Sequence, residues 1–152
     1  MEAETLTIIL AEDDDGHATL IRRNLERVRP NFALVRLNHG ERLLEYLRLE
    51  ASRPGGRRRL LLLLDIRMPG MDGMEVLRRM KADAALRTIP IYMLTTTDNP
   101  SEVARCFELG CNAYLTKPVS SQDFTVTMER LCAFLEISQI PMAPPEYQDA
   151  TA

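Results

Sequence analysis

The chain alternates between short, strongly apolar segments and longer segments in which apolar residues recur every three or four positions. Five of the short segments have the length and composition typical of β-strands. They span residues 6–11, 32–37, 60–66, 91–95 and 113–116. The third contains five consecutive leucines, which is typical of a strand buried on both faces in a parallel sheet covered by helices.

The segments between these strands have the periodicity of amphipathic helices. Each of five predicted helices is defined by apolar residues on one face: Ala18, Ile21, Leu25 and Val28; Leu43, Leu44 and Leu47; Met74, Leu77 and Met80; Val103, Cys106 and Phe107; and Phe124, Met128, Leu131 and Leu135. Ser120 and Asp123 resemble a cap at the start of the last helix. Alternating strands and helices predict an α/β fold with right-handed crossovers. We expect a doubly wound, flavodoxin-like parallel sheet of five strands in the order 2-1-3-4-5.

These elements predict one domain, residues 1–137, followed by a C-terminal extension, residues 138–152, and no effector domain. A chain of 152 residues can bury roughly 70% of its unfolded surface, so its core needs no disulfide or metal. Residues 52–59, SRPGGRRR, join the second helix to the third strand, at the opposite end of the sheet from Asp65. They form either a solvated loop or a docking patch for an acidic partner.

The composition argues against several classes of protein. The 19 basic and 22 acidic residues give a net charge of −3, so binding to DNA or an anionic membrane through bulk charge is not expected. The three cysteines form no CxxC pair and are odd in number, which favours reduced residues that pack in the core. An acidic N-terminus, and the lack of an apolar run near ~20 residues, favour a cytoplasmic protein without a membrane span.

Acidic residues follow two strands that are neighbours in the predicted order. Glu12 and Asp13 follow the first strand, and Asp65 follows the third. Two carboxylates ~4 Å apart repel by about 4 kcal/mol at an effective dielectric of 20, so three of them must take up protons or recruit a cation. Mg²⁺ suits a small open cluster of oxygen ligands. Asp14 and Asp15 are assigned instead to the cap and first turn of the following helix.

Asp65 can then act as a carboxylate nucleophile towards phosphorus. A phosphoryl group on Asp65 needs hydrogen-bond donors, and Thr95 and Lys117 end the fourth and fifth strands. Lys117 is one of only two lysines in a chain rich in arginine, which indicates a need for a compact positive charge.

The motifs LAEDD, DIRMPGMDG, LTT and YLTKP occur in this order along the chain. Together they resemble the response-regulator receiver domain of two-component signalling, over roughly residues 5 to 137. The resemblance implies a CheY-like fold and makes Asp65 the phosphoacceptor. It implies that Mg²⁺ is held by Asp13, by Asp65, by the backbone carbonyl of Arg67 and, through water, by Glu12.

The same resemblance assigns further roles around the pocket. Thr95 and Lys117 become the phosphoryl contacts, with a cis peptide bond before Pro118 that aims the lysine inward. Thr95 and Tyr114 form a switch in which the tyrosine rotates inward after phosphorylation. The residues expected to flank the pocket are Arg67, Met68, Thr96 and Thr97.

The resemblance extends to stand-alone regulators paired with phytochrome-type histidine kinases, through residues 112–141, TTTDNPSE and LEISQIP. It implies a sensor histidine kinase, of the bacteriophytochrome type, as the partner. It also implies a homodimer formed through the fourth helix, fifth strand, fifth helix and C-terminal extension. The protein would be a phosphoacceptor rather than an enzyme, apart from Mg²⁺-dependent self-phosphorylation and dephosphorylation.

Two other interpretations differ in class. A pseudo-receiver would keep the fold and the dimer face but signal without phosphate; the presence of Asp13, Asp65, Thr95 and Lys117 argues against it. A metal-dependent phosphatase would carry its nucleophile after the first strand, whereas here it follows the third. His17 could suggest internal phosphotransfer, but its position favours a surface or helix-packing residue.

Overall fold

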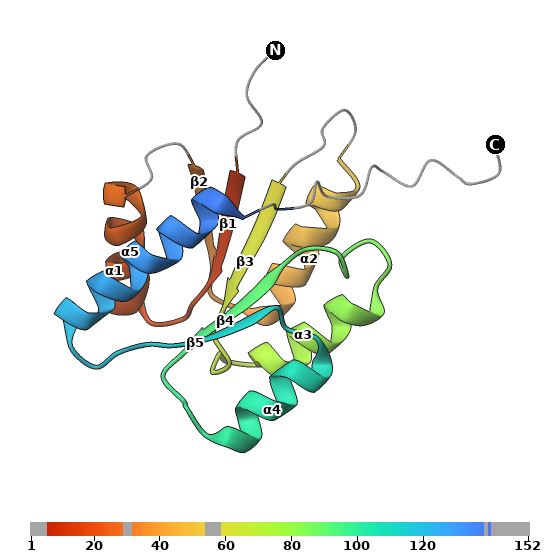
Figure 1. Ribbon diagram of the computed structural model, residues 1–152. Coiled ribbons are helices and arrows are strands. Elements are labelled where there is room, and N and C mark those ends of the chain that lie inside the picture. The colour runs from red at the N-terminus through yellow and green to blue at the C-terminus, as the bar shows by residue number, and fades with distance from the viewer. Residues whose placement is uncertain (1–5, 29–31, 54–58, 139, 141–152) are drawn as a thin grey trace, which may run out of the picture.

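A five-stranded parallel sheet lies between two layers of helices in the computed structural model, which describes residues 6–28, 32–53, 59–138 and 140 (Figure 1). The strands are β1 (Leu6–Ala11), β2 (Phe32–Leu37), β3 (Arg59–Leu64), β4 (Ile91–Thr95) and β5 (Ala113–Thr116). The helices are α1 (Asp15–Val28), α2 (Gly40–Ala51), α3 (Gly73–Ala82), α4 (Pro100–Leu109) and α5 (Ser121–Ile137). The strand order is β2-β1-β3-β4-β5, which confirms the predicted fold.

Each face of the sheet has its own core. On one face α1 and α5 cover the sheet, and on the other face α2, α3 and α4 do so (Figure 1). The five leucines of β3 are divided between the two cores, since Leu61 and Leu63 belong to one and Leu60, Leu62 and Leu64 to the other. The continuous apolar run therefore reports a strand that is buried on both faces.

All three cysteines are buried within these cores, as the sequence predicts. Cys106 and Cys111 pack with α2 and α3, and Cys132 packs with α1 on the other face. Burial raises the pKa of the Cys106 thiol to about 11. Cys106 is therefore a packing residue rather than a nucleophile.

Capping residues set the helix boundaries. Asp72 accepts a hydrogen bond from the Glu75 amide at the start of α3, and Asn99 and Ser120 cap α4 and α5 in the same way. The Ser120 cap was predicted from the sequence. Gly110 ends α4 with a φ of 105°, a left-handed conformation that glycine adopts without steric cost.

Two local details differ from the sequence prediction. Strand β3 ends at Leu64 rather than residue 66, because Asp65 and Ile66 already belong to the loop that leads to α3 at Gly73. On α4 the buried residue is Cys106, whereas Phe107 is 50% exposed. The inward face of α4 runs through Val103, Cys106 and Leu109, and Phe107 lies about 100° around the helix from Cys106.

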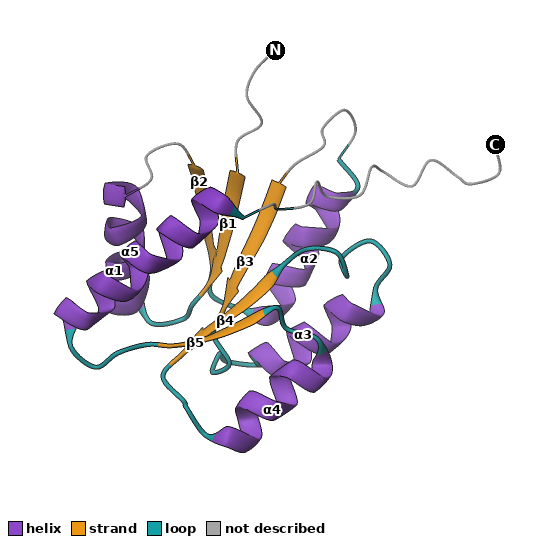
Figure 2. Cartoon of the chain, in the orientation of Figure 1, coloured by secondary structure: helices purple, strands orange, loops and turns teal. Residues whose placement is uncertain are grey.

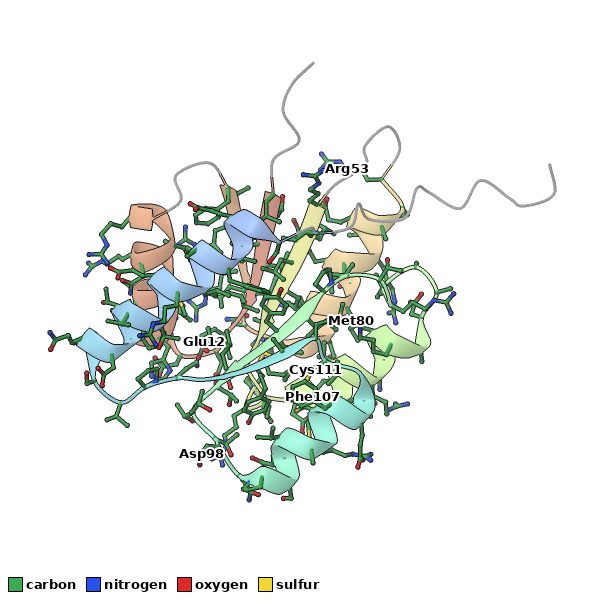
Figure 3. All side chains as sticks on the ribbon, viewed as in Figure 1. Glu12, Arg53, Met80, Asp98, Phe107 and Cys111 are labelled. Atoms are coloured by element: carbon green, nitrogen blue, oxygen red, sulfur yellow. The ribbon has the colours of Figure 1, made fainter. Side chains whose placement is uncertain are left out.

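The carboxyl ends of the strands and the described ends of the arginine-rich connection, Arg53 and Arg59, lie at opposite ends of the sheet. In Figure 3 Glu12, directly after β1, lies at one end and Arg53, after α2, lies at the other. Residues 54–58 of that connection, and residues 141–152 of the predicted extension, lie outside the described residues. Among the described residues, no helix has the length and apolarity that a membrane span requires.

Gly73 makes close packing behind Asp65 possible, so its replacement is a test of the fold. A Cβ at Gly73 would lie 2.2 Å from the Asp65 carbonyl oxygen and 2.8 Å from Ile66 Cα. Both contacts are with backbone, so Gly73→Ala should lower the free energy of unfolding by about 1–3 kcal/mol. Urea denaturation measures this change.

Gly16→Ala is the matched control for this substitution. Its Cβ would lie 3.1 Å from Asp14 Oδ1, an exposed side-chain atom that needs to shift by only a few tenths of an ångström while it caps the helix, and alanine favours the helix. We expect the stability of this variant to lie within about 1 kcal/mol of the wild type. Equal stabilities for the two variants would contradict the packing role of Gly73.

Candidate functional site

The parallel register of β1 and β3 brings Glu12 and Asp65 together. Ala11 pairs with Leu64, and the Asp65 amide donates to the Ala11 carbonyl at 3.1 Å. The residues that follow, Glu12 and Asp65, therefore emerge side by side, and both are buried. Figure 2 shows the loops that follow β1, β3, β4 and β5 gathered at this end of the sheet.

Three carboxylates converge at this point. Oxygen atoms of Glu12, Asp13 and Asp65 all lie within 4.8 Å of one another, with Asp13 on the exposed side. The predicted convergence of acids from two strands is thus present. Oxygen ligands around a concentrated negative charge fit a hard divalent cation.

Lys117 supplies the positive charge within the pocket. Its Nζ donates to Glu12 Oε2 and, at 3.0 Å, to Asp65 Oδ2. The lysine side chain is only 1% exposed, so the ammonium and the two carboxylates form one buried ionic cluster. Removing one partner of such a cluster leaves an uncompensated buried charge.

The structure contains no cis peptide bond among its described residues, so the Lys117–Pro118 bond is trans. The expectation of a cis bond is therefore wrong. The backbone amide of Lys117 donates to the Thr95 carbonyl at 2.7 Å, and two carboxylates hold its ammonium. These contacts direct the side chain inward with a trans bond.

Thr95 carries a buried hydroxyl with no partner. The residue is fully buried, and its Oγ1 makes no hydrogen bond. An unsatisfied buried hydroxyl costs about 1–3 kcal/mol. It is an available donor at the end of the strand beside β3.

Tyr114 is tied to the loop that follows Thr95. Its hydroxyl donates to the Thr97 carbonyl at 2.7 Å, and Thr97 Oγ1 donates to Glu102 Oε2 at 2.5 Å. Burial is the main factor that raises the pKa of Tyr114 to about 12, with Cys106 and Glu102 nearby. Tyr114, half-buried on β5, is thereby linked to the first turn of α4.

A cavity of about 610 Å³ forms the open side of the site, and Asp13, Arg67, Met68 and Glu102 are among its lining residues. The Arg67 amide donates to Asp65 Oδ1 at 3.3 Å. Of the residues expected to flank the pocket, Arg67 and Met68 line this cavity. Thr97 reaches it through Glu102, and Thr96 is exposed and lies outside the lining.

The sequence did not identify two residues of the site. His17 Nδ1 lies 3.3 Å from Lys117 Nζ and 3.7 Å from Glu12 Oε1, so its assignment to surface or helix packing was incomplete. Asp14 caps α1 by accepting from the His17 amide at 2.9 Å. That cap places the first turn of α1, and with it the histidine ring, beside the pocket.

Arg36 of β2 is the second residue. Its Nε donates to the Glu12 carbonyl at 3.0 Å, and its Nη1 donates to Asp15 Oδ1 at 2.7 Å. The guanidinium therefore fixes the loop that carries Glu12 and Asp13. No local sequence signal identifies this role, because it depends on the pairing of β1 with β2.

The doubly wound sheet, the acids at the ends of β1 and β3, and the lysine at the end of β5 together define a phosphoacceptor signalling module. The chain belongs to the response regulator receiver domain family, whose model matches residues 8–129.

Two curated relatives illustrate the family's range. The chain is 40% identical over 134 residues to the probable methanogenesis regulatory protein FilR2 of Methanothrix harundinacea, a match that covers 86% of this chain and 84% of the relative. It is 31% identical over 137 residues to response regulator Rcp1 of Synechocystis, covering 90% and 93%.

Solved structures agree with this assignment. A receiver domain from Rhodospirillum rubrum matches with a TM-score of 0.82 and 37% identity over 90% of this chain and 98% of that one. The phosphorylated cyanobacterial phytochrome response regulator RcpA gives 0.82 and 29%, covering 91% and 99%. The Mn²⁺-bound form of Rcp1 gives 0.79 and 30%, covering 89% and 98%. The chain thus resembles phytochrome-associated regulators.

The pKa of Glu12 predicts a pH-dependent stability. Burial raises this pKa from 4.5 to about 7, although Lys117 opposes the change. Between these values the folded state binds more protons than the unfolded state, so the free energy of unfolding falls as the pH rises. Over this pH range the titration of Glu12 lowers the free energy of unfolding of the wild type by up to about 3 kcal/mol. Glu12→Gln should lack this decrease.

Urea denaturation of wild type and Glu12→Gln, with a chelator present, at about pH 5 and about pH 8 measures the effect. Relative to the wild type, Glu12→Gln should be more stable at the higher pH than at the lower pH. A difference that does not vary with pH would show that Glu12 stays ionised in the folded protein.

Proposed function

We propose that this protein is a response regulator that accepts a phosphoryl group from a histidine kinase onto Asp65. The observation that carries this proposal is the environment of the Asp65 carboxylate. One of its oxygens accepts from the Lys117 ammonium, and the strand beside it ends in the unpartnered hydroxyl of Thr95. The receiver domain occupies residues 1–137, and residues 138–152 form an extension.

The transfer needs few groups from the protein. A carboxylate oxygen of Asp65 attacks phosphorus, the bond from phosphorus to the donor histidine nitrogen breaks, and its electron pair returns to the imidazole. Lys117 and the Thr95 hydroxyl then donate to oxygens of the new acyl phosphate. Charge-assisted hydrogen bonds of this kind are shorter and stronger than neutral ones.

The donor set fits Mg²⁺ as the cofactor. Three carboxylates face one ammonium within the pocket, which leaves an excess of negative charge for a divalent cation to balance. Glu12, Asp13, Asp65 and the backbone carbonyl of Arg67 are the residues that would hold it. When bound, the ion neutralises the carboxylates and the transferred phosphoryl group.

Thr95 and Tyr114 couple the site to the surface. Donation by the Thr95 hydroxyl to a phosphoryl oxygen shifts the end of β4 towards Asp65. The Thr97 carbonyl, two residues further on, accepts from the Tyr114 hydroxyl, so the same shift disturbs that hydrogen bond. Tyr114 then rotates inward and changes the surface between α4 and β5.

The output face is formed by α4, β5 and α5. The exposed large apolar side chains among the described residues are Leu49, Phe107, Val119, Val126 and Phe134. All except Leu49 lie on α4, α5 or the connection that precedes α5. A groove of about 340 Å³ between β5 and α5, lined by Leu115, Leu131 and Phe134 among others, adds to this apolar surface. We propose that a homodimer forms here.

Similarity to phytochrome-associated regulators supports a bacteriophytochrome-type histidine kinase as the donor. RcpA is a phytochrome response regulator, and Rcp1 matches over nearly its whole length. A cytoplasmic location is consistent with such a kinase partner.

Phosphorylation at Asp65 can be tested with a small phosphodonor. Incubation with Mg²⁺ and acetyl phosphate should add to the wild type one phosphoryl group that hydroxylamine removes, detected by intact mass. Asp65→Asn should remain unmodified because the neutral amide oxygen is a much weaker nucleophile than a carboxylate oxygen. Asp83→Asn, at the end of α3, is the control and should be modified like the wild type. Labelling that persists in Asp65→Asn would place the phosphoryl group elsewhere.

Self-association tests the output face. Phe134→Ser removes an aromatic ring that is 52% exposed on α5, and Leu49→Ser removes a side chain that is 64% exposed on α2. Loss of one large apolar contact at an interface costs roughly 1–3 kcal/mol, so the dimer should weaken at least about fivefold in the first variant only. Light scattering over a concentration series measures this. Equal masses for the two variants would contradict the proposed face.

A further inference from the structure

The ammonium of Lys117 has a third neighbour that the proposed phosphotransfer leaves unassigned. A lysine ammonium donates three hydrogen bonds and accepts none. Its three neighbours here are Glu12 Oε2, Asp65 Oδ2 and His17 Nδ1, the last at 3.3 Å. Since the ammonium only donates, Nδ1 is the acceptor, and the ring carries its proton on Nε2.

The other two acceptors of the ammonium, Glu12 and Asp65, are also expected to bind the cation. Glu12 and Asp65 belong to the carboxylate cluster that fits a cation, and Asp65 is also the proposed nucleophile. A cation that draws on these carboxylates weakens their hold on Lys117. His17 carries no carboxylate, so a hard cation, which prefers oxygen ligands, draws on Glu12 and Asp65 rather than on His17.

We infer that His17 is a positioning residue that keeps Lys117 aimed at Asp65 when the carboxylates bind a cation. This inference rests on the proposed phosphorylation of Asp65. The backbone of His17 is fixed by the Asp14 cap. Its ring is 40% exposed, whereas the Lys117 side chain is 1% exposed, so the ring covers the ammonium on the α1 side of the pocket.

A neutral acceptor suits this position better than a carboxylate would. A fourth acid would compete for the cation and add to the excess negative charge of the pocket. Asparagine is the closest neutral substitute, because its Oδ1 is attached to Cγ, as Nδ1 is in histidine. His17→Asn should therefore retain the contact that His17→Ala removes.

A double-mutant cycle separates positioning from a general structural effect. The rate of Asp65 phosphorylation by acetyl phosphate is measured at saturating Mg²⁺ in wild type, His17→Ala, Lys117→Ala and the double variant. The substitution His17→Ala should lower the rate about 3- to 10-fold when Lys117 is present, and less than about twofold in the Lys117→Ala background. His17→Asn should restore most of the rate. His39→Ala, another exposed histidine, should have no effect.

Chemical accessibility of Lys117 provides a readout that does not depend on phosphorylation. The chain has two lysines, so Lys81 is an internal reference during reductive methylation followed by mass spectrometry. Lys117 should react several-fold faster in His17→Ala than in wild type, and Lys81 should react equally in both.

The outcomes distinguish this inference from the proposed function. If the wild type is not phosphorylated on Asp65, the proposed function fails, and the accessibility of Lys117 still tests its contact with His17. If the wild type is phosphorylated and His17→Ala lowers the rate equally with and without Lys117, the positioning role is wrong. Unchanged reactivity of Lys117 in His17→Ala would also overturn it.

Discussion

One buried ammonium between two buried carboxylates is the constraint on which the site depends. Lys117 donates to both Glu12 and Asp65, and an isolated charge at any of these positions would be costly to bury. The charges come from three strands, so their balance requires the parallel register of the sheet. Two further residues help to keep these charges together. Arg36 fixes the loop after β1, and Gly73 permits close packing behind Asp65.

The fold was predictable because its signals are local and repeated. Apolar runs marked the strands, three-to-four-residue spacing marked the helices, and their alternation left few topologies. The errors lie where tertiary packing overrides the pattern. Strand β3 stops at Leu64, before Asp65 and Ile66, and Phe107 is exposed because α4 presents Cys106 to the core. Ile66 and Phe107 are both apolar, so the pattern alone could not exclude them from the strand or from the buried face of the helix.

The site was predictable only where strand ends define it. Glu12, Asp13 and Asp65 converge because adjacent parallel strands deliver them to one edge. His17 and Arg36 act across elements, from the first turn of α1 and from β2, and their contacts follow from a helix cap and a strand pairing. The cis bond expected before Pro118 is absent, and Lys117 reaches Glu12 and Asp65 with a trans bond.

The buried hydroxyl of Thr95 gives the proposed switch an energetic basis. Moving a two-state equilibrium from 1:99 to 99:1 requires about 5.5 kcal/mol. A hydrogen bond from this hydroxyl to a charged phosphoryl oxygen contributes about 1.5–3 kcal/mol, a value that already includes the relief of the unsatisfied group. This is roughly a quarter to a half of the required free energy. The Thr95 hydroxyl therefore supplies a substantial part of the bias on the Thr97–Tyr114 contact, because it is unpaired before phosphorylation.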